Sequence, residues 1–498
     1  MNEKSRSFSV SMIVRGGFWL YAGSIIDNFS GFLYWMLVST LVGPTAIGIA
    51  STISSLSGLI LTFLSLGIST GAIRFFGMFY GSDEGDKLNT YFWSTYVFNL
   101  LTHVVAGVLL LLLGIGGHEF GGISSYMLIF ASFMVIAGLG TIPSSLITSM
   151  LKTEVLFIST VLSILFRFTV GIVLISNYGL GWIGAVIGNL TQLYVRLAVI
   201  NFYAVKEVPP KLSLSYKAIA DTLIAGMPSW LPTFITSIGS LLGVLSVYVI
   251  SGALETGYYY VSSAIANVVL MVGTSILSLT FPVLSGMADG RKRALTQVMK
   301  VSIALITPPS IYVMIYSWLP LSWLGRDYVN SAPILTTLLI SAIPSAITSG
   351  VVSLTYAYGK YSLVLAINVV SSFVRMVLYY VLIPYYGGLG SAIASTVGSF
   401  AGFLATLYVA KIIGFTLGWR LLAETVAIPL MLGGISFALN VHWLIALAVT
   451  TSSYILYLKL RIVGKDELKE IVKALRMESL AIKIYSKYGD IINKILGY

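Results

Sequence analysis

The residue types that usually carry out chemistry are scarce in this 498-residue chain. It has no cysteine, which excludes thiolate catalysis, disulfides and cysteine-ligated metals. The three histidines, His103, His118 and His442, lie far apart in the sequence and lack the short spacing of metal ligands. We therefore expect no metal and no cofactor. A membrane enzyme, the remaining enzyme class, needs reactive side chains in a sizeable outer loop, and the outer loops predicted below are short and nearly uncharged, so the protein is not expected to be an enzyme.

A few charged residues instead interrupt long apolar stretches. Arg167 and Arg375 each lie near the middle of such a stretch, where an arginine costs about 2.5–3.5 kcal/mol if the stretch spans a bilayer. Two roles are open for them. They can line a polar cavity and contact an anionic substrate group, or they can bond structurally to carbonyls or to a carboxylate on a neighbouring helix.

Three further residues are candidates for a site. Arg196 lies nearer the end of its stretch and could extend to the membrane surface. Arg74 closes the second stretch, where it is either an inner-leaflet anchor or a substrate contact. Asp27 lies within the first stretch, in YAGSIIDNFSGF, and an intramembrane carboxylate suggests ion coupling or cation binding. Its alternative role is to pair with one of the intramembrane arginines.

The composition identifies the elements that must position these residues. Hydrophobic residues make up 57% of the chain and charged residues 9%, against about 25% charged in a soluble domain. The mean hydropathy is +0.93. Such a chain cannot cover a soluble surface with charge, which excludes a soluble enzyme and a disordered protein. We predict an all-α membrane protein with many spans.

Apolar windows of the length that a membrane helix needs predict about fourteen transmembrane helices. They lie at residues 16–40, 45–73, 92–114, 123–149, 155–176, 182–203, 220–250, 256–281, 298–318, 331–356, 362–383, 388–410, 418–437 and 441–459.

The distribution of basic residues supports this number and sets the orientation. With both termini cytoplasmic, the inner segments and tail hold 25 of the 29 lysines and arginines, and only Arg326 lies in an outer segment. This asymmetry follows the positive-inside rule. It predicts a multi-pass protein of the cell membrane with cytoplasmic termini, and it assigns the net charge of +11 to topology and membrane lipids. A nucleic-acid partner is excluded, because no soluble basic domain is present.

The two halves of the chain repeat at an offset of about 209 residues. Matched pairs include Gly43/Gly252, Gly48/Gly257, Met78/Met287, Gly81/Gly290 and Arg167/Arg375, the last at an offset of 208. Each copy holds six spans and therefore has the same orientation, which predicts parallel repeats related by a pseudo-twofold axis along the membrane normal. Two C-terminal spans lie outside the repeat.

The predicted organisation has six parts. They are a cytoplasmic N-terminus (1–15), an N-lobe (16–205), a cytoplasmic linker (206–219), a C-lobe (220–411), two extra spans (412–460) and a cytoplasmic amphipathic tail (461–498).

The second span and its inner loop, LGISTGAIRFFGMFYGSDEGDKL, resemble the N-terminal region of the Wzx-type oligosaccharide flippases. These are polysaccharide-biosynthesis transporters of the multidrug/oligosaccharidyl-lipid/polysaccharide (MOP) superfamily. The resemblance implies a MATE/MOP-like fold of two lobes around a central cavity, with alternating access. It also implies translocation of polyprenyl- or dolichyl-linked sugars, with (pyro)phosphate held by basic residues, of which Arg74, Arg167, Arg375 and Arg196 are the candidates. A lipid-linked glycan and membrane lipids are the implied partners, and glycan-assembly enzymes are candidate partners.

The chain departs from one branch of that superfamily. Flippases of peptidoglycan precursors carry arginines within the first span, whereas this first span carries Asp27 and no internal arginine. A lipid II substrate is therefore disfavoured. The alternative function is a cation-coupled multidrug exporter of the MATE type, which Asp27 favours and the two extra spans and the arginines disfavour. The glycan, the lipid carrier, the coupling ion and the oligomeric state stay undetermined by the sequence.

Overall fold

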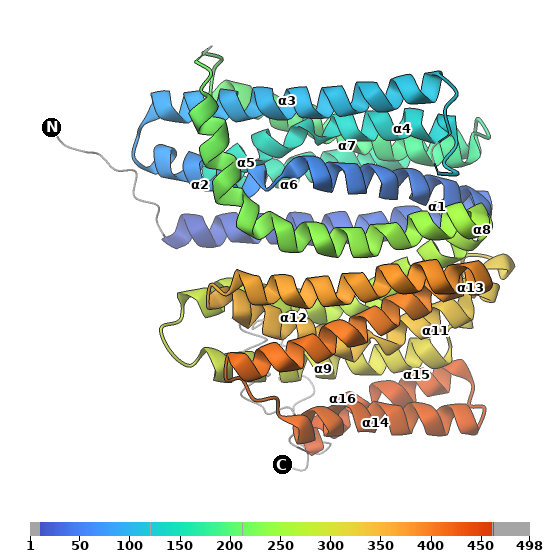
Figure 1. The fold of residues 1–498 in the computed structure, drawn as a ribbon. Helices are drawn as coiled ribbons and strands as arrows, with labels where there is room; N and C mark the ends of the chain where they lie inside the picture. Colours follow the sequence, from blue (N-terminus) through green and yellow to red (C-terminus); the bar gives the residue numbers. More distant parts are fainter. Residues whose placement is uncertain (1–9, 120, 212, 461, 463–498) are drawn as a thin grey trace, which may run out of the picture. The chain divides into compact units, whose positions relative to one another are not determined.

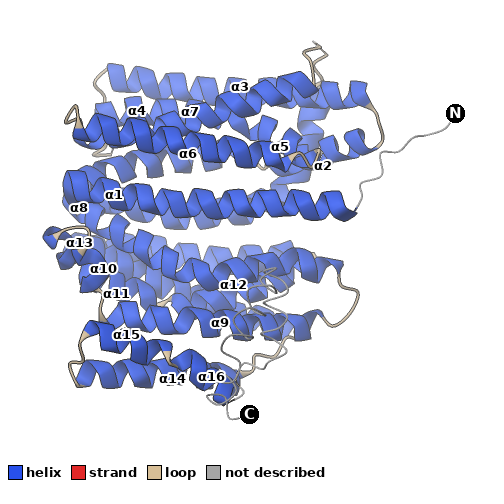
Figure 2. Cartoon of the chain, turned by 180° about the vertical axis from the view of Figure 1, so that it is seen from behind, coloured by secondary structure: helices blue, strands red, loops and turns tan. Residues whose placement is uncertain are grey.

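A computed structural model describes residues 10–119, 121–211, 213–460 and 462. In that part of the chain the regular structure is helical throughout (Figure 2). The predicted amphipathic helix in the tail lies outside the described residues, as do residues 1–9 of the predicted cytoplasmic N-terminus.

The helices follow one another with short connections. They are α1 (Val10–Ser65), α2 (Ile68–Gly81), α3 (Gly85–Ile115), α4 (Ser125–Ile136), η1 (Ala137–Gly140), α5 (Thr141–Ser149), α6 (Thr153–Ser176), α7 (Gly181–Glu207), α8 (Tyr216–Gly286), α9 (Arg291–Ile315), α10 (Trp318–Ser322), η2 (Arg326–Ser331), α11 (Ala332–Ile340), α12 (Ala342–Ala357), α13 (Tyr361–Ile412), α14 (Trp419–Ala438), α15 (Trp443–Thr451) and α16 (Ser453–Lys459).

Three of these helices are each two spans joined at a glycine. The breaks are at Gly43 in α1, Gly252 in α8 and Gly387 in α13, with φ of 75°, 85° and 53°. Glycine adopts this left-handed region without the steric cost that a Cβ brings. The described residues form nine helices long and apolar enough to cross a membrane, plus two shorter apolar ones. Dividing the three broken helices gives the fourteen predicted spans, so the predicted all-α membrane fold is confirmed.

The second span is longer than its predicted window and is interrupted. Within the predicted window 45–73, helix α1 ends at Ser65. Leu66 and Gly67 follow with φ of 42° and 75°, and α2 begins after them. The helix resumes as α2 and continues to Gly81. The candidate residue Arg74 therefore lies on a separate short helix.

The first of two compact units comprises residues Met1–Val261 and Met376–Ser391. In Figure 1 its helices α3, α4, α6 and α7 run alongside α1. One apolar cluster gathers Ile53, Met127 and Val186, and a second joins α2 to α3 and α5 through Phe76, Phe92 and Leu146. These clusters hold α1, α2 and α7, and a third one packs Val155 and Leu156 of α6 against Ile200 of α7. The four helices carry four of the five candidate residues.

The second unit comprises Ser262–Arg375 and Ala392–Tyr498. Its core packs the last part of α8 against α9 and α12 through residues such as Leu277, Ile303 and Val351. Tyrosine hydroxyls tie the last two spans to α9. Tyr454 donates to the carbonyl of Leu305 at 3.1 Å. Pro309, four residues on, has no N–H to offer that carbonyl, so the tyrosine satisfies it.

The boundaries of the predicted lobes differ from those of the two compact units, because the lobes were defined by the repeat in the sequence. The boundaries 1–15, 16–205, 206–219, 220–411, 412–460 and 461–498 stay predictions, as does the pseudo-twofold relation between the repeats.

Candidate functional site

Arg167 is deeply buried in the first unit, where α6 packs against α1 and α7. Its relative exposure is 4%, and it donates from Nη1 to Oε1 of Gln192 at 2.8 Å. The guanidinium carbon lies 4.0 Å from the ring centroid of Tyr34 and 5.7 Å from that of Trp35. Its Nε has no hydrogen-bond partner among the described residues. The charge of Arg167 is therefore met by an amide and two aromatic faces.

The network continues from Gln192 to Asp27 and Arg196. Gln192 donates from Nε2 to Oδ1 of Asp27 at 2.9 Å. Arg196 donates from Nη1 to the other carboxylate oxygen, Oδ2, at 3.1 Å. The side chains of Arg196 and Asp27 are 37% and 35% exposed, so this ion pair lies at the open edge of the network. Asp27 therefore pairs with an intramembrane arginine, which was the alternative to ion coupling that the sequence left open.

Helical spacing explains how the three spans assemble this network. Gln192 and Arg196 are four residues apart on α7 and share one face, so both reach Asp27 on α1. Asp27 and Tyr34 are seven residues apart on α1, two turns along the same face. Tyr34 is held by its own hydroxyl, which donates to the carbonyl of Ala185 at 2.8 Å.

Arg375 has much simpler surroundings in the second unit. It is half-buried on α13 and donates from Nη2 to Oγ of Ser399 at 2.8 Å. Its side-chain stem lies directly over Gly398, where a Cβ would overlap it. No carboxylate lies within ion-pair distance of Arg375 in the described chain, and its Nε is without a hydrogen-bond partner there.

Arg74 is exposed on α2. Its guanidinium carbon lies 5.8 Å from the ring centroid of its neighbour Phe75, and no ion pair to a described residue involves it. The structure thus brings together three of the five candidates, Asp27, Arg167 and Arg196. Arg74 and Arg375 lie outside that network.

Sequence reasoning missed two members of the network. Gln192 bridges Arg167 to Asp27, and Tyr34 covers the guanidinium of Arg167. A signal for the first was present, since Gln192 is one of only two glutamines in the chain and lies within an apolar span. Tyr34 carried a weaker signal, its two-turn spacing from Asp27.

Glycines bring α1 and α2 into backbone contact with α8 at two separate levels of the first unit. At one level, a Cβ on Gly48 would overlap the carbonyl of Ala253, and a Cβ on Gly257 would overlap that of Pro44. In the predicted repeat these residues are partners, since Gly48 matches Gly257 and Pro44 matches Ala253 at an offset of 209. The contact is therefore reciprocal.

At the other level the same helices meet at the break between α1 and α2. A Cβ on Gly226 would overlap the carbonyl of Gly67, and one on Gly71 would overlap that of Thr222. Trp230 donates from Nε1 to the carbonyl of Thr62 at 2.8 Å beside them. Only glycine permits backbones to approach so closely.

The fold and the span count define the class of this protein, a polytopic all-helical membrane protein. Several solved structures share the fold. "Lipid II flippase MurJ, inward closed conformation" has a TM-score of 0.74 at 13% identity, covering 89% of this chain and 98% of that one.

Two structures of a multidrug resistance MATE family transporter of the MOP superfamily are also similar. The inward-facing one has a TM-score of 0.63 at 16% identity, covering 81% of this chain and 98% of its own. The outward-facing one has a TM-score of 0.54 at 14% identity, covering 81% and 95%. At identities this low, the structural similarity shows a shared fold and nothing about substrates.

The sequence profile of a family described as "Polysaccharide biosynthesis protein" matches residues 37–333. This is more than half of the chain, and the protein belongs to that family. A search of curated proteins finds no match.

Proposed function

We propose that this protein translocates a lipid-linked oligosaccharide, a polyprenyl- or dolichyl-phosphate or -pyrophosphate sugar, from the cytoplasmic to the outer leaflet of the cell membrane. The glycan would serve cell-surface polysaccharide or glycoprotein synthesis. Membership in the polysaccharide biosynthesis family and a fold shared with a lipid II flippase support this assignment. No bond is made or broken in such a step.

The observation that carries the proposal is the uncompensated charge of Arg375. An arginine at mid-span depth is costly, and its described polar partner is the Ser399 hydroxyl. The negative charge of a phosphate that crosses the membrane is also costly, because it must be removed from water. The planar guanidinium stays charged at low dielectric and can bond two phosphate oxygens at once, so each group offsets the cost of the other.

Arg74, exposed and without a carboxylate partner in the described chain, is proposed as a second phosphate contact. Arg167 is assigned a smaller part, because Gln192 and the ring of Tyr34 already hold its guanidinium. Arg196 is partly neutralised by Asp27. The first span carries this aspartate where peptidoglycan-precursor flippases carry arginines, which favours a lipid-linked glycan other than lipid II.

The test is glycan export in cells that depend on this protein. We expect Arg375→Ala and Arg74→Ala to reduce export at least tenfold while protein remains in the membrane, and Lys at either position to restore part of it. Arg326→Ala, in a predicted outer segment, is the matched control and should export normally. Normal export by both Ala variants would exclude the phosphate-clamp proposal.

Alternating access is the proposed mechanism, and the two glycine contacts between α1–α2 and α8 support it. A backbone contact that only glycine permits can act as a gate. The two helices close without a gap, and few side chains have to be rearranged when they separate. The contacts lie at two levels of the same helices, as two gates would.

The gates can be tested with single methyl groups. Gly226→Ala and Gly257→Ala should each prevent one closure and lower export severalfold, whereas Gly434→Ala, with open space around its Cα, should be silent. Equal export by all three variants would mean that these contacts never need to close.

The second candidate function is a cation-coupled multidrug exporter of the MATE type, whose fold this chain shares. Asp27 is the observation in its favour. An arginine already pairs with this carboxylate, so a cationic drug would have to displace Arg196. Drug efflux that depends on Asp27, with glycan export unaffected by the arginine variants, would favour the exporter.

A further inference from the structure

A surface cavity at the start of α9 is not used by the proposed translocation. It has a volume of about 400 Å³ and is lined by Ala288, Asp289, Gly290, Arg291, Lys292 and Tyr358. In the predicted topology this loop faces the cytoplasm. The cavity thus lies where lipid headgroups of the inner leaflet are within reach.

Two cations line this cavity without a carboxylate partner in the described chain. Arg291 is fixed in place by neutral groups, since it donates from Nε to the carbonyl of Met287 at 2.7 Å and from Nη1 to that of Ala357 at 2.9 Å. Lys292 is exposed, and its ammonium lies beside Gly414. The charges of both side chains therefore remain available to an anion.

The remaining charges near the cavity do not cancel these two. Asp289 accepts a hydrogen bond from the backbone N–H of Gly290 with its Oδ1. Arg293 follows in the same turn, and Lys360, next to the loop that holds Tyr358, is exposed as well. The surface around the cavity has a clear excess of positive charge.

The helix that begins here would also be stabilised by a bound anion. The N-terminus of a helix carries partial positive charge and normally has acidic residues in its first turn. The first turn of α9 holds Arg291, Lys292 and Arg293 and no acidic residue, and no side chain caps its N-terminus. A nearby anion would stabilise both the helix end and the three cations.

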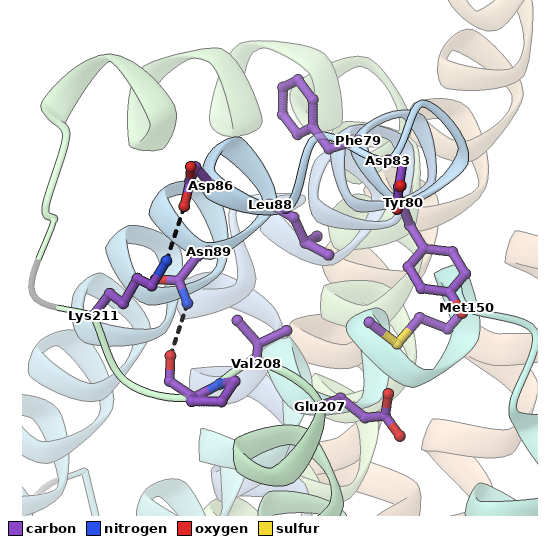
Figure 3. Close-up of a pocket in the computed structure, with 12 residues that line it drawn as sticks. Phe79, Tyr80, Asp83, Asp86, Leu88, Asn89, Met150, Glu207, Val208 and Lys211 are labelled. Carbon is purple, nitrogen blue, oxygen red and sulfur yellow. Dashed lines mark hydrogen bonds and ion pairs between the residues drawn. The ribbon is translucent and has the colours of Figure 1, made fainter. Parts of the chain in front are cut away.

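The matching loop of the first half has the opposite character, and serves as an internal reference. Met78 and Gly81 match Met287 and Gly290 in the repeat. The cavity there, about 480 Å³, is lined by Asp83, Asp86 and Glu207 besides Lys211 (Figure 3).

Charges in that first cavity are paired within the protein. Lys211 binds Asp86 at 2.9 Å, Lys152 binds Glu207 at 2.5 Å, and Asp86 lies in the first turn of α3. The positive-inside rule acts on both loops alike. The rule therefore explains why both loops carry basic residues. It does not explain why the described basic residues of the second loop lack carboxylate partners.

We propose that the cavity at the start of α9 binds the phosphoryl headgroup of an anionic phospholipid in the inner leaflet. Arg291 and Lys292 would bind the phosphoryl oxygens, with Arg293 and Lys360 adding charge at the rim. Phosphate is the natural ligand for clustered arginine and lysine beside a helix N-terminus. Anionic lipids also concentrate at the cytoplasmic surface, where basic segments attract them.

The experiment measures binding of short-chain phosphatidylglycerol to the full-length protein in a neutral detergent, by native mass spectrometry. The variant Lys292→Ala/Arg293→Ala/Lys360→Ala removes three charges and leaves Arg291 to hold the loop. Its matched control, Lys87→Ala/Lys206→Ala/Lys211→Ala, removes three charges from the inner end of the first half. We expect at least fivefold weaker binding in the first variant and unchanged binding in the control.

Several outcomes would overturn the proposal. Equal loss in both variants would indicate non-specific attraction to charge, and no loss in either would exclude the site. Equal binding of short-chain phosphatidylcholine would exclude selection of an anionic headgroup. Competition by inorganic phosphate at the same concentration would indicate a free-anion site instead. Normal melting of the first variant excludes misfolding as a cause of lost binding, and if it melts abnormally the single variant Lys292→Glu replaces it.

The inner location is tested separately with an impermeant thiol reagent. Lys292→Cys should label only after the cells are permeabilised, whereas Asn177→Cys, exposed in a predicted outer turn, should label in intact cells. Labelling of Lys292→Cys in intact cells would overturn the assignment to inner-leaflet lipid.

Discussion

The surroundings of Arg167 and Arg375 differ far more than their matched positions in the sequence suggest. Arg167 lies in a network with Gln192, Asp27 and Arg196 and is covered by an aromatic ring. Arg375 has a serine hydroxyl as its described polar partner. The difference teaches that the charge of an arginine can be compensated by neighbouring side chains in one half of a molecule while the arginine at the matching position has no described carboxylate partner.

Substitutions in the sequence account for this difference. At an offset of 209, the positions that match Asp27, Gln192 and Arg196 are Thr236, Ala401 and Ala405. None of them carries a charge, and at an offset of 208 the positions hold Ile235, Phe400 and Leu404, which are apolar. The second half therefore has the matching arginine, Arg375, but has no residues that correspond to Asp27 and Gln192.

A second difference between the halves is reciprocal: where one half has a tyrosine the other has a glycine, and the reverse holds at a second pair of positions. Tyr34 matches Gly243 at an offset of 209, and Gly171 matches Tyr379 at an offset of 208. The Tyr34 hydroxyl packs where Gly171 lacks a Cβ, and the Tyr379 hydroxyl lies 2.8 Å from the place where Gly243 would carry one. Each hydroxyl donates to a carbonyl, Tyr34 to Ala185 at 2.8 Å and Tyr379 to Gly239 at 2.9 Å. This reciprocal exchange is a further argument for the predicted repeat.

The largest expected effect comes from making Arg375 resemble the paired arginines of the first half. Ser399→Asp places a carboxylate where the serine hydroxyl now lies 2.8 Å from the guanidinium. The new ion pair would compete with a substrate phosphate, so export should fall at least tenfold, about 1.4 kcal/mol of binding free energy. Transport of radiolabelled lipid-linked glycan in vesicles would measure it. Ser399→Asn, which adds similar volume without charge, is the control. Retained transport in the Asp variant would show that Arg375 does not contact the phosphate.

A smaller effect, on stability, should distinguish Arg167 from Arg375. Arg167→Ala removes a buried cation and leaves the amide oxygen of Gln192 and the face of Tyr34 without their partner, which should cost about 2–3 kcal/mol. Arg375→Ala loses one hydrogen bond at a half-buried site and should cost about 1 kcal/mol. Thermal unfolding of the purified proteins in detergent would compare them. Equal destabilisation would remove the structural distinction between the two arginines.

The smallest effect on stability is expected at Asp27. Asp27→Asn can still accept the hydrogen bond from Gln192 but no longer neutralises Arg196, and both members of that pair are about one-third exposed. Partly exposed ion pairs contribute little, so we expect a loss of about 0.5–1 kcal/mol in the same unfolding assay. A much larger loss would place Asp27 at the centre of the network rather than at its edge.

Function can change at Asp27 even where stability does not. If glycan transport by the stable Asp27→Asn variant loses its dependence on an ion gradient, Asp27 couples the ion. Unchanged transport with unchanged gradient dependence would leave Asp27 as the partner of Arg196 alone.

Much of the fold was predictable from the sequence, because its physical causes are local. A helix must satisfy its backbone hydrogen bonds inside a bilayer, so apolar windows of sufficient length have to be spans. The turns at Gly43 and Gly252 were visible as matched glycines, and the left-handed φ angles there explain why glycine is needed. The break at Leu66–Gly67 was missed, since a single glycine in an apolar run is also common within a continuous helix.

The sequence by itself determined the class of protein, the number of spans and which charged residues lie within them, because the cost of burying polar groups acts residue by residue. Only the tertiary structure decided what each charge does. Whether Arg167 contacts Gln192 and Tyr34, and whether Arg375 donates to Ser399, depends on how helices far apart in the sequence pack and rotate. A charge in an apolar span must find compensation, but its partner comes from another helix, and hydropathy does not encode which face that helix presents.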